Sequence, residues 1–371
     1  MRQVYLDHNA STPIADAVSE SMIPYLTSAF GNPSSGHWAG APAKEAVERA
    51  RGQVASLLGC SRAEVVFTSG GTEANNYALK GAFYAKGGHG HIITTAVEHP
   101  AIIQPCRFLE RLGAQVTILP VDATGLVDPE DVARAIRPDT ILVTVMHANN
   151  EVGTIQPISE IAAVCREAGV LSHTDAAQSV GKIPTRVDEL GVDMLSLAGH
   201  KFYGPKGVGA LYVRESVHLE PFMHGAGHES GRRGGTENVL LDVGLGTAAM
   251  LADDLESASH MRELRDRFWS LLRAEFGDRV VLNGHPDKRL PNTLNVSFVG
   301  SIGPDILAGM PEVAATTGSA CHSGSVSMSP VLAAMHASDD VAAGTVRFSL
   351  GRATTWSELE YVGARLAAVL A

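Results

Sequence analysis

Asp175 and Lys201 are the two residues of this chain whose types and positions most directly indicate chemistry. Asp175 lies in "HTDAAQSVG" and Lys201 in "SLAGHKFYGPKGVG", and each follows a short run that is typical of a β-strand. In open α/β sheets, ligands bind at the carboxyl ends of the strands, so an acid and an amine delivered there can converge. The alternative is a buried Asp–Lys ion pair with a purely structural role, but removing both charges from water costs more free energy than their attraction usually contributes.

One cofactor needs this acid and this amine together with a phosphate site. Pyridoxal phosphate requires a lysine that binds it covalently, a carboxylate that keeps its ring nitrogen protonated, and a cradle for its phosphate. The stretch "FTSGGTEANN" places Gly70, Gly71 and Thr72 between a predicted strand and a predicted helix, where free backbone N–H groups favour a phosphate. It matches neither the dinucleotide nor the nucleoside-triphosphate glycine motif, and a plain tight turn explains this stretch alone equally well.

A cysteine, Cys321, lies in "TTGSACHSGSVSMSP", the longest stretch without hydrophobic periodicity. Small and polar neighbours of this kind are typical of a reactive thiol. The other cysteines are Cys60, Cys106 and Cys165, which form no C-x-x-C pair, so we predict neither a disulfide framework nor a metal site. We expect Cys106 and Cys165, in helix-like and partly apolar contexts, to be buried and inert.

Short apolar runs alternate with helix-like patterns over about the first 250 residues, as in "AEVVFTSG" followed by "TEANNYALKGAFYAKGG". This alternation predicts an α/β fold built from βα units around a mostly parallel sheet. A long charged helix pattern at residues 253–275 then introduces a smaller α+β part. We predict a large domain over residues 16–255 and a small domain formed by residues 1–15 and 256–371, which carries the cysteine loop.

The composition indicates a globular protein whose partners are small molecules or proteins. Of the 371 residues, 45% are hydrophobic and 19% charged, and the formal net charge of -11 argues against nucleic-acid and anionic membrane surfaces. No apolar run approaches the ~18 residues of a membrane span, and the first residues, "MRQVYLDHNASTP", do not resemble a signal peptide. We expect a cytoplasmic location.

Eight longer motifs occur together in the order seen in the cysteine desulfurases of the class V aminotransferase group. They are "TSGGTEANN", "VEHPAI", "ANNEVGTIQPI", "HTDAAQSVGK", "GHKFYGPKGVGALYVR", "RRGGTENV", "LPNTLNVSF" and "GSACHSG". The chain resembles this group over essentially its whole length. The resemblance implies the fold of the pyridoxal-phosphate-dependent transferases, of the aspartate aminotransferase type, and a homodimer. It implies conversion of L-cysteine to L-alanine with a persulfide on Cys321, whose sulphur passes to an acceptor protein.

The resemblance also assigns individual residues. It implies that Lys201 binds the cofactor covalently, that Asp175 pairs with the pyridine nitrogen, and that His99 stacks on the ring and relays protons. Its remaining cofactor contacts are Gly71, Thr72, Asn150, Gln178 and His200, with Thr236 contributed by the second subunit. Its substrate and sulphur residues are Asn32 and Arg347, for the substrate carboxylate, and the nucleophile Cys321.

Two positions depart from the pattern of the desulfurases that serve iron–sulphur cluster assembly. Ala198 stands where those enzymes usually have a serine, which predicts the loss of one side-chain bond to the phosphate. His322 follows Cys321 where a small hydroxyl residue is common; it is either a solvated loop residue or one that favours the thiolate. Both features resemble selenocysteine lyases, so selenium release from L-selenocysteine is the alternative activity. An alternative from another class is a non-catalytic subunit that keeps the fold.

Overall fold

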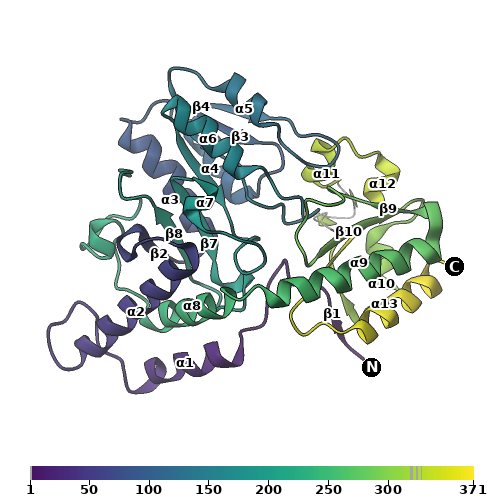
Figure 1. The fold of residues 1–371 in the computed structure, drawn as a ribbon, viewed down its shortest axis with the longest axis horizontal. Helices are drawn as coiled ribbons and strands as arrows, with labels where there is room; N and C mark the ends of the chain where they lie inside the picture. The colour runs from purple at the N-terminus through teal and green to yellow at the C-terminus, as the bar shows by residue number, and fades with distance from the viewer. Residues whose placement is uncertain (1, 318–320, 323–324, 327) are drawn as a thin grey trace.

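A seven-stranded sheet forms the centre of the larger part of the molecule (Figure 1). The computed structural model describes residues 2–317, 321–322, 325–326 and 328–371. The strands, in their order across the sheet, are β2 (Val65–Thr68), β8 (Gly209–Val213), β7 (Met194–Ala198), β6 (Leu171–Asp175), β5 (Thr140–Thr144), β3 (His91–Thr95) and β4 (Gln115–Leu119). Only β8 runs antiparallel to its two neighbours; the other adjacent pairs are parallel. The predicted mostly parallel sheet is confirmed.

Helices cover both faces of this sheet, which explains why whole strands of it are buried. All residues of β3, β5, β7 and β8 are buried, as expected for strands covered on two sides. One face packs on α3 (Gly71–Ala85) and α4 (Pro100–Glu110). The other face packs on α2 (Gly40–Leu58), α5 (Pro129–Ala135), α6 (Ile158–Ala168), α7 (Val187–Leu190) and α8 (Val239–Ala252), and α1 (Asp16–Thr27) lies against α8.

A second apolar core lies in the right-hand part of Figure 1, around a small antiparallel sheet. The strands of this sheet are β14 (Thr345–Ser349), β10 (Thr293–Phe298) and β9 (Val280–Leu282). The long helices α9 (Glu256–Phe276) and α13 (Trp356–Val369) pack beside each other in this part. Buried Val4 and Leu6 from the N-terminal segment belong to the same core. Both ends of the described chain therefore lie in this part of the molecule.

The charged helix predicted at residues 253–275 is confirmed as α9. Its buried residues, among them Met261, Leu264 and Phe268, fall on one face, as an amphipathic surface helix requires. The shorter elements of this region are β1 (Val4–Tyr5), paired with β11 (Val313–Ala314), and α10 (Gly303–Ala308), α11 (Pro330–Ala334) and α12 (Asp339–Ala343).

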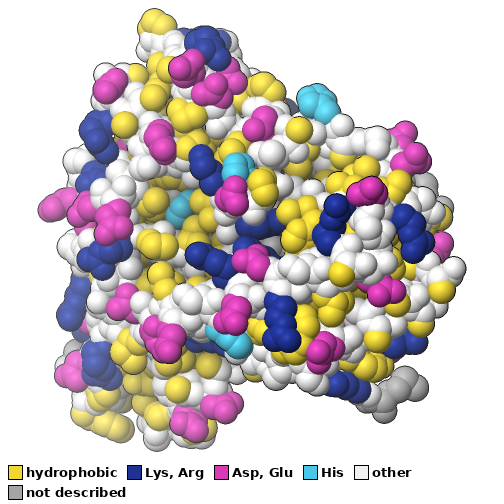
Figure 2. Space-filling model, turned by 45° about the vertical axis from the view of Figure 1, so that its right-hand side comes forward, with side chains coloured by type: hydrophobic (Ala, Val, Ile, Leu, Met, Phe, Trp, Pro, Cys, Tyr) yellow, Lys and Arg dark blue, Asp and Glu magenta, His cyan; other side chains and the backbone are white. Residues whose placement is uncertain are grey.

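Charges of both signs share the surface. On the face in Figure 2, Lys and Arg side chains are interspersed with Asp and Glu, and Lys or Arg side chains gather around a hollow near the middle. This mixture differs from the continuous basic surfaces that bind nucleic acids. No helix among the described residues is long and apolar enough to cross a membrane.

A buried ion pair ties α2 to strand β2, which leads into the predicted phosphate turn. Glu229 accepts hydrogen bonds from Arg51 at 2.6 and 2.8 Å and from the backbone N–H of Phe67 at 3.0 Å. The side chains of Arg51 and Glu229 are only 9% and 2% exposed. Removing one partner of such a pair leaves the other charge buried without compensation.

We therefore expect Glu229→Ala to lower the free energy of unfolding by about 3–5 kcal/mol. Urea unfolding followed by circular dichroism measures this. The matched control is Glu45→Ala, which removes the exposed Glu45–Arg49 pair from the same helix, α2, and which should change the midpoint far less. Equal midpoints for the two variants would contradict the argument from burial.

Candidate active site

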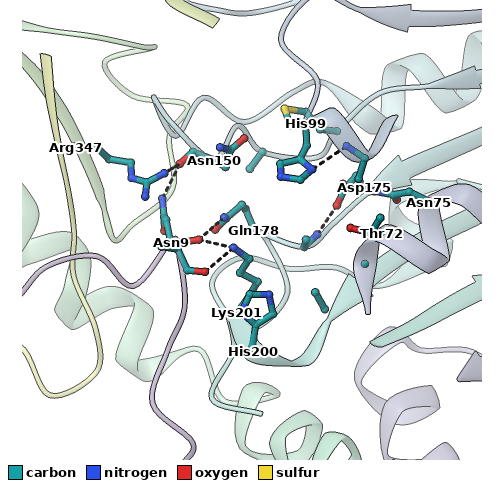
Figure 3. A pocket seen from close by; sticks show the side chains of 17 residues that line it. Asn9, Thr72, Asn75, His99, Asn150, Asp175, Gln178, His200, Lys201 and Arg347 are labelled. Atoms are coloured by element: carbon teal, nitrogen blue, oxygen red, sulfur yellow. Dashed lines mark hydrogen bonds between the residues drawn. The ribbon is translucent and has the colours of Figure 1, made fainter. Parts of the chain in front are cut away.

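A pocket opens at the carboxyl edge of the seven-stranded sheet (Figure 3). Strand β6 ends at Asp175, and β7 ends shortly before Lys201. The predicted residues that line the pocket are Gly71, Thr72, His99, Asn150, Asp175, Gln178, His200, Lys201 and Arg347. Adjacent parallel strands thus bring together side chains that lie far apart along the chain.

Lys201 lies in the short turn after β7, and its amine points into the pocket (Figure 3). Its Nζ donates hydrogen bonds to the backbone carbonyl oxygens of Asn9, at 2.7 Å, and Ala10, at 3.0 Å. Burial lowers the pKa of Lys201 to about 8, Arg347 adds to this effect, and Asp175 opposes it. A larger fraction of this amine is therefore neutral at pH 7 than in an ordinary lysine.

Asp175 is held as an acceptor by two donors. Asn75 of α3 donates from Nδ2 to Oδ2 at 2.6 Å, and the backbone N–H of Ala177 donates to Oδ1 at 2.9 Å. Asn75 is fully buried, and its Oδ1 has no hydrogen-bond partner among the described residues. Asn75 was not predicted as a site residue, although its place in "TEANN", on the inner face of the helix after the glycine turn, was a usable signal.

His99 begins helix α4 and faces the same pocket. Its Nδ1 accepts the backbone N–H of Ala101 at 3.1 Å, so the proton of the neutral ring lies on Nε2. Burial lowers the pKa of His99; Asp175 opposes this shift and Lys201 adds to it. The ring is therefore a neutral imidazole that offers an Nε2–H donor.

The first residues of α3 line the part of the pocket that was predicted to bind a phosphate. Gly71 and Thr72 are the first residues of this helix, whose leading N–H groups have no acceptor within the helix. His200 contacts Ser11, with 3.2 Å between Nδ1 and Oγ, and burial, aided by Lys201, lowers its pKa to about 4. Ala198 presents a methyl group to the pocket, so it offers no hydroxyl donor there.

Arg347, from strand β14, closes the pocket on the side of the small sheet. Its side chain is 7% exposed, and it donates to Asp7 Oδ1 and to the backbone oxygen of Asn150, both at 2.7 Å. Its Nε is buried without a hydrogen-bond partner among the described residues. Arg347 was predicted as a site residue, but Asp7, whose carboxylate holds one end of the guanidinium, was not.

Three predicted residues are not placed in this pocket. The described residues that line it do not include Asn32 or Thr236. Asn32 is exposed between α1 and α2, where it accepts the backbone N–H of Ser34, and Thr236 lines a separate hollow beside Glu229. The backbone of Cys321 lies in β12 (Cys321–His322), antiparallel to β13 (Ser325–Val326). The Cys321 and His322 side chains lie outside the described residues, so their predicted roles are untested.

The other three cysteines are poor nucleophiles. Cys106 and Cys165 are buried, which confirms that expectation, and Cys60 is half-buried. Burial raises the pKa of each of these thiols to about 12. Because the thiolate is the reactive form, these side chains are nearly inert at neutral pH. Among the residues that the structure describes, no His, Cys, Asp and Glu side chains cluster as a metal site.

Comparison with known proteins adds the family. The family model described as "Aminotransferase class-V" matches residues 4–362. The chain belongs to the class V aminotransferase family. The "Cysteine desulfurase IscS" of Dictyoglomus turgidum is 48% identical over 366 residues, which are 97% of this chain and 92% of that protein. The resemblance drawn from the eight motifs is thereby confirmed.

Solved structures of this family share the architecture. A "NifS-like protein" superposes with a TM-score of 0.92 at 38% identity, covering 99% of both chains. A structure described as "SspA in complex with cysteine" has a TM-score of 0.84 at 41% identity and covers 95% of this chain and all of that one. The predicted fold, of the pyridoxal-phosphate-dependent transferase type, is therefore confirmed for this class V chain.

Proposed function

We propose that this protein is a cysteine desulfurase that depends on pyridoxal 5′-phosphate. It converts L-cysteine to L-alanine and leaves a persulfide on Cys321. The observation that carries the proposal is that three features meet in one pocket. The pKa of Lys201 is lowered, both carboxylate oxygens of Asp175 accept hydrogen bonds, and the first N–H groups of α3 have no acceptor within the helix. One cofactor accounts for all three features.

The residues of the pocket fit this cofactor. Gly71, Thr72 and His200 would hold its phosphate, Asp175 its ring nitrogen, and Lys201 its aldehyde carbon. His99 would lie on its ring, with Asn150 and Gln178 as polar neighbours. When bound, the cofactor draws electrons from the α-carbon of the substrate.

The chain's own residues supply binding and proton handling. Arg347 binds the substrate carboxylate, because a guanidinium fork suits a planar anion. Lys201, as a neutral amine, can accept a proton at Nζ, and His99 can hold one at Nε2. The thiol of Cys321 then takes the sulphur atom: cysteine and thiol give alanine and persulfide, so the reaction needs no outside oxidant.

The experiment that tests this function is incubation of the holoenzyme with L-cysteine. We expect alanine to form and the intact protein to gain the mass of one sulphur atom, mapped to Cys321 by peptide mass spectrometry. Alanine without added sulphur, or sulphur on Cys60, Cys106 or Cys165, would refute the proposed route. A protein that forms no alanine while its lysine binds the cofactor would support the non-catalytic alternative.

Selenocysteine lyase is not the favoured activity. The relative named above is called a cysteine desulfurase, and one solved neighbour holds cysteine. The two activities are separated by comparing the turnover of L-cysteine and L-selenocysteine. A marked preference for L-selenocysteine would reverse the assignment.

Arg347 provides the sharpest test of substrate binding. We expect Arg347→Gln to raise KM for L-cysteine by about 100-fold, because a charge-assisted bidentate contact with the carboxylate is lost. Steady-state kinetics measures this, with Arg352→Gln as the matched control, since Arg352 bonds to the backbone of Leu251 outside the pocket. Equal KM values for the two variants would contradict the role of Arg347.

The proposal extends to assembly and setting. We propose a cytoplasmic homodimer in which Thr236 of one subunit reaches the phosphate site of the other, and in which Asn32 helps to bind the substrate carboxylate. The large domain would span residues 16–255, and the small domain residues 1–15 and 256–371. A sulphur-acceptor protein would take the persulfide sulphur, for iron–sulphur cluster assembly or for the thiolation of tRNA or DNA. The free thiols of Cys60, Cys106 and Cys165 suit a reducing compartment.

A further inference from the structure

Lys182 is a buried lysine that the proposed reaction does not use. It is 6% exposed, and its Nζ donates to the backbone oxygen and to the side-chain Oε1 of Gln178, both at 3.0 Å. Among the described residues it forms no ion pair with a carboxylate within 4.0 Å. Burying an amine without a charged partner costs free energy.

The contacts of Gln178 with Asn9 and Lys182 settle how the Gln178 amide is oriented. A backbone carbonyl oxygen only accepts hydrogen bonds, so the Gln178 atom that faces Asn9 is the nitrogen, Nε2, and the atom that faces Lys182 is the oxygen, Oε1. The opposite atom, Nε2, then donates to the backbone oxygen of Asn9 at 2.9 Å, and that same oxygen accepts Lys201 Nζ at 2.7 Å (Figure 3). A hydrogen-bonded chain therefore runs from Lys182 through Gln178 and Asn9 to Lys201.

The turn that carries Lys182 is packed closely against its surroundings. Gly181 has φ of +72°, and a Cβ at that position would lie 3.0 Å from Cβ of Ala252 and 3.1 Å from Cβ of Phe202. Phe202 is the residue after Lys201, so this turn and the Lys201 segment pack directly on each other. Close packing restricts both segments, which makes the orientation of Gln178 a property of the fold rather than of a mobile side chain.

We propose that Lys182 is a positioning residue, which fixes the Gln178 amide with Nε2 toward Asn9 and the pocket and thereby holds Asn9 in place to receive Lys201. The second hydrogen on Nε2 remains as a donor for the cofactor. The activity that this arrangement serves rests on the proposed function. The arrangement itself is a property of the protein before any cofactor binds.

Lys182 loses its proton at a lower pH than Lys201 does. Burial, with the charges of Lys201 and Arg347, lowers the pKa of Lys182 to about 7, whereas the pKa of Lys201 is about 8. Lys182 is therefore mostly neutral when Lys201 titrates, and it acts on the Lys201 segment through its hydrogen bonds to Gln178 rather than through its charge. A neutral amine still donates to both Gln178 oxygens.

The test measures Lys201 without substrate or cofactor. The cofactor-free protein is acetylated briefly at a series of pH values, and the fraction of modified Lys201 is read by peptide mass spectrometry. In Lys182→Met we expect the midpoint of Lys201 labelling to stay in place, because Lys182 is already mostly neutral at the pH where Lys201 titrates. We also expect pyridoxal phosphate to bind about tenfold more weakly, because the Gln178 amide is no longer held.

Two further variants separate positioning from charge. Lys182→Gln removes the charge but keeps an N–H donor for Gln178, so cofactor affinity should be largely restored and the labelling midpoint should again stay in place. Lys206→Met removes a positive charge from an exposed lysine that acts on His200, and it should change neither quantity. Unchanged affinity in a folded Lys182→Met protein, an equal loss of affinity in Lys182→Gln, or the same loss in Lys206→Met would overturn the proposal.

If Lys182→Met does not fold, the cofactor affinity of Lys182→Gln decides: a tenfold loss in that folded protein, which keeps the donor to Gln178, overturns the positioning role of Lys182. If the protein proves inactive on cysteine, the affinity result still stands, because cofactor binding involves neither substrate nor turnover. Failure of the proposed function and failure of the Lys182 assignment therefore give different results.

Discussion

A Lys201→Ala variant is expected to form alanine from L-cysteine at least about 10⁴-fold more slowly than the wild-type protein. Two losses combine in this change: the amine that binds the cofactor, and the group that accepts a proton beside the substrate. Both tasks need a neutral amine, and burial supplies it by lowering the pKa of Lys201 to about 8. In the wild-type protein, the neutral fraction and the rate of cofactor capture should therefore rise as the pH increases through about 8.

Two readouts check this prediction. Alanine is quantified after incubation with L-cysteine, and covalent cofactor binding is followed by absorption at the violet edge of the visible spectrum and by mass after borohydride reduction. The matched control is Lys206→Ala, at an exposed lysine outside the pocket, which should keep activity and absorption. Substantial alanine formation by Lys201→Ala would refute the role of Lys201.

A Cys321→Ala variant is expected to form no persulfide and to release sulphur from L-cysteine at least about 10³-fold more slowly than the wild-type protein. The prediction rests on the need for a thiolate and on the exclusion of the other three cysteines. The sulphur must pass to a thiolate, and burial raises the pKa of Cys60, Cys106 and Cys165 to about 12. Cofactor binding, which depends on other residues, should be unchanged.

Sulphide and alanine assays, together with intact mass, measure the effect of Cys321→Ala. Cys60→Ala is the matched control, because Cys60 is the least buried of the three described cysteines, and it should keep full activity. Sulphur release from L-cysteine by Cys321→Ala would argue against the persulfide route. If that variant released selenium from L-selenocysteine at an undiminished rate, direct elimination and the lyase alternative would be supported.

The architecture was largely readable from local patterns. The run "TEANNYALKGAFYAKGG" became α3, "MLSLAGHK" became β7 and its turn, and residues 253–275 became α9 within a few positions. These elements are predictable because burial on two sides selects continuous apolar strands, while burial on one side selects a helical stripe. The reversed direction of β8 was not foreseen, because neither periodicity nor composition encodes strand direction.

The sequence by itself determined which groups can do chemistry: the amine of Lys201, the carboxylate of Asp175 and the glycine turn, each at the end of an element. Only the tertiary structure decided what surrounds them. The bonds from Lys201 to Asn9, from Asn75 to Asp175 and from Asp7 to Arg347 each join residues 100 or more positions apart. The first of these bonds ends on a backbone carbonyl, which every residue carries, so no residue type marks it in advance. The pKa values of Lys201 and Lys182 depend on burial and on neighbouring charges, which exist only after the chain has folded.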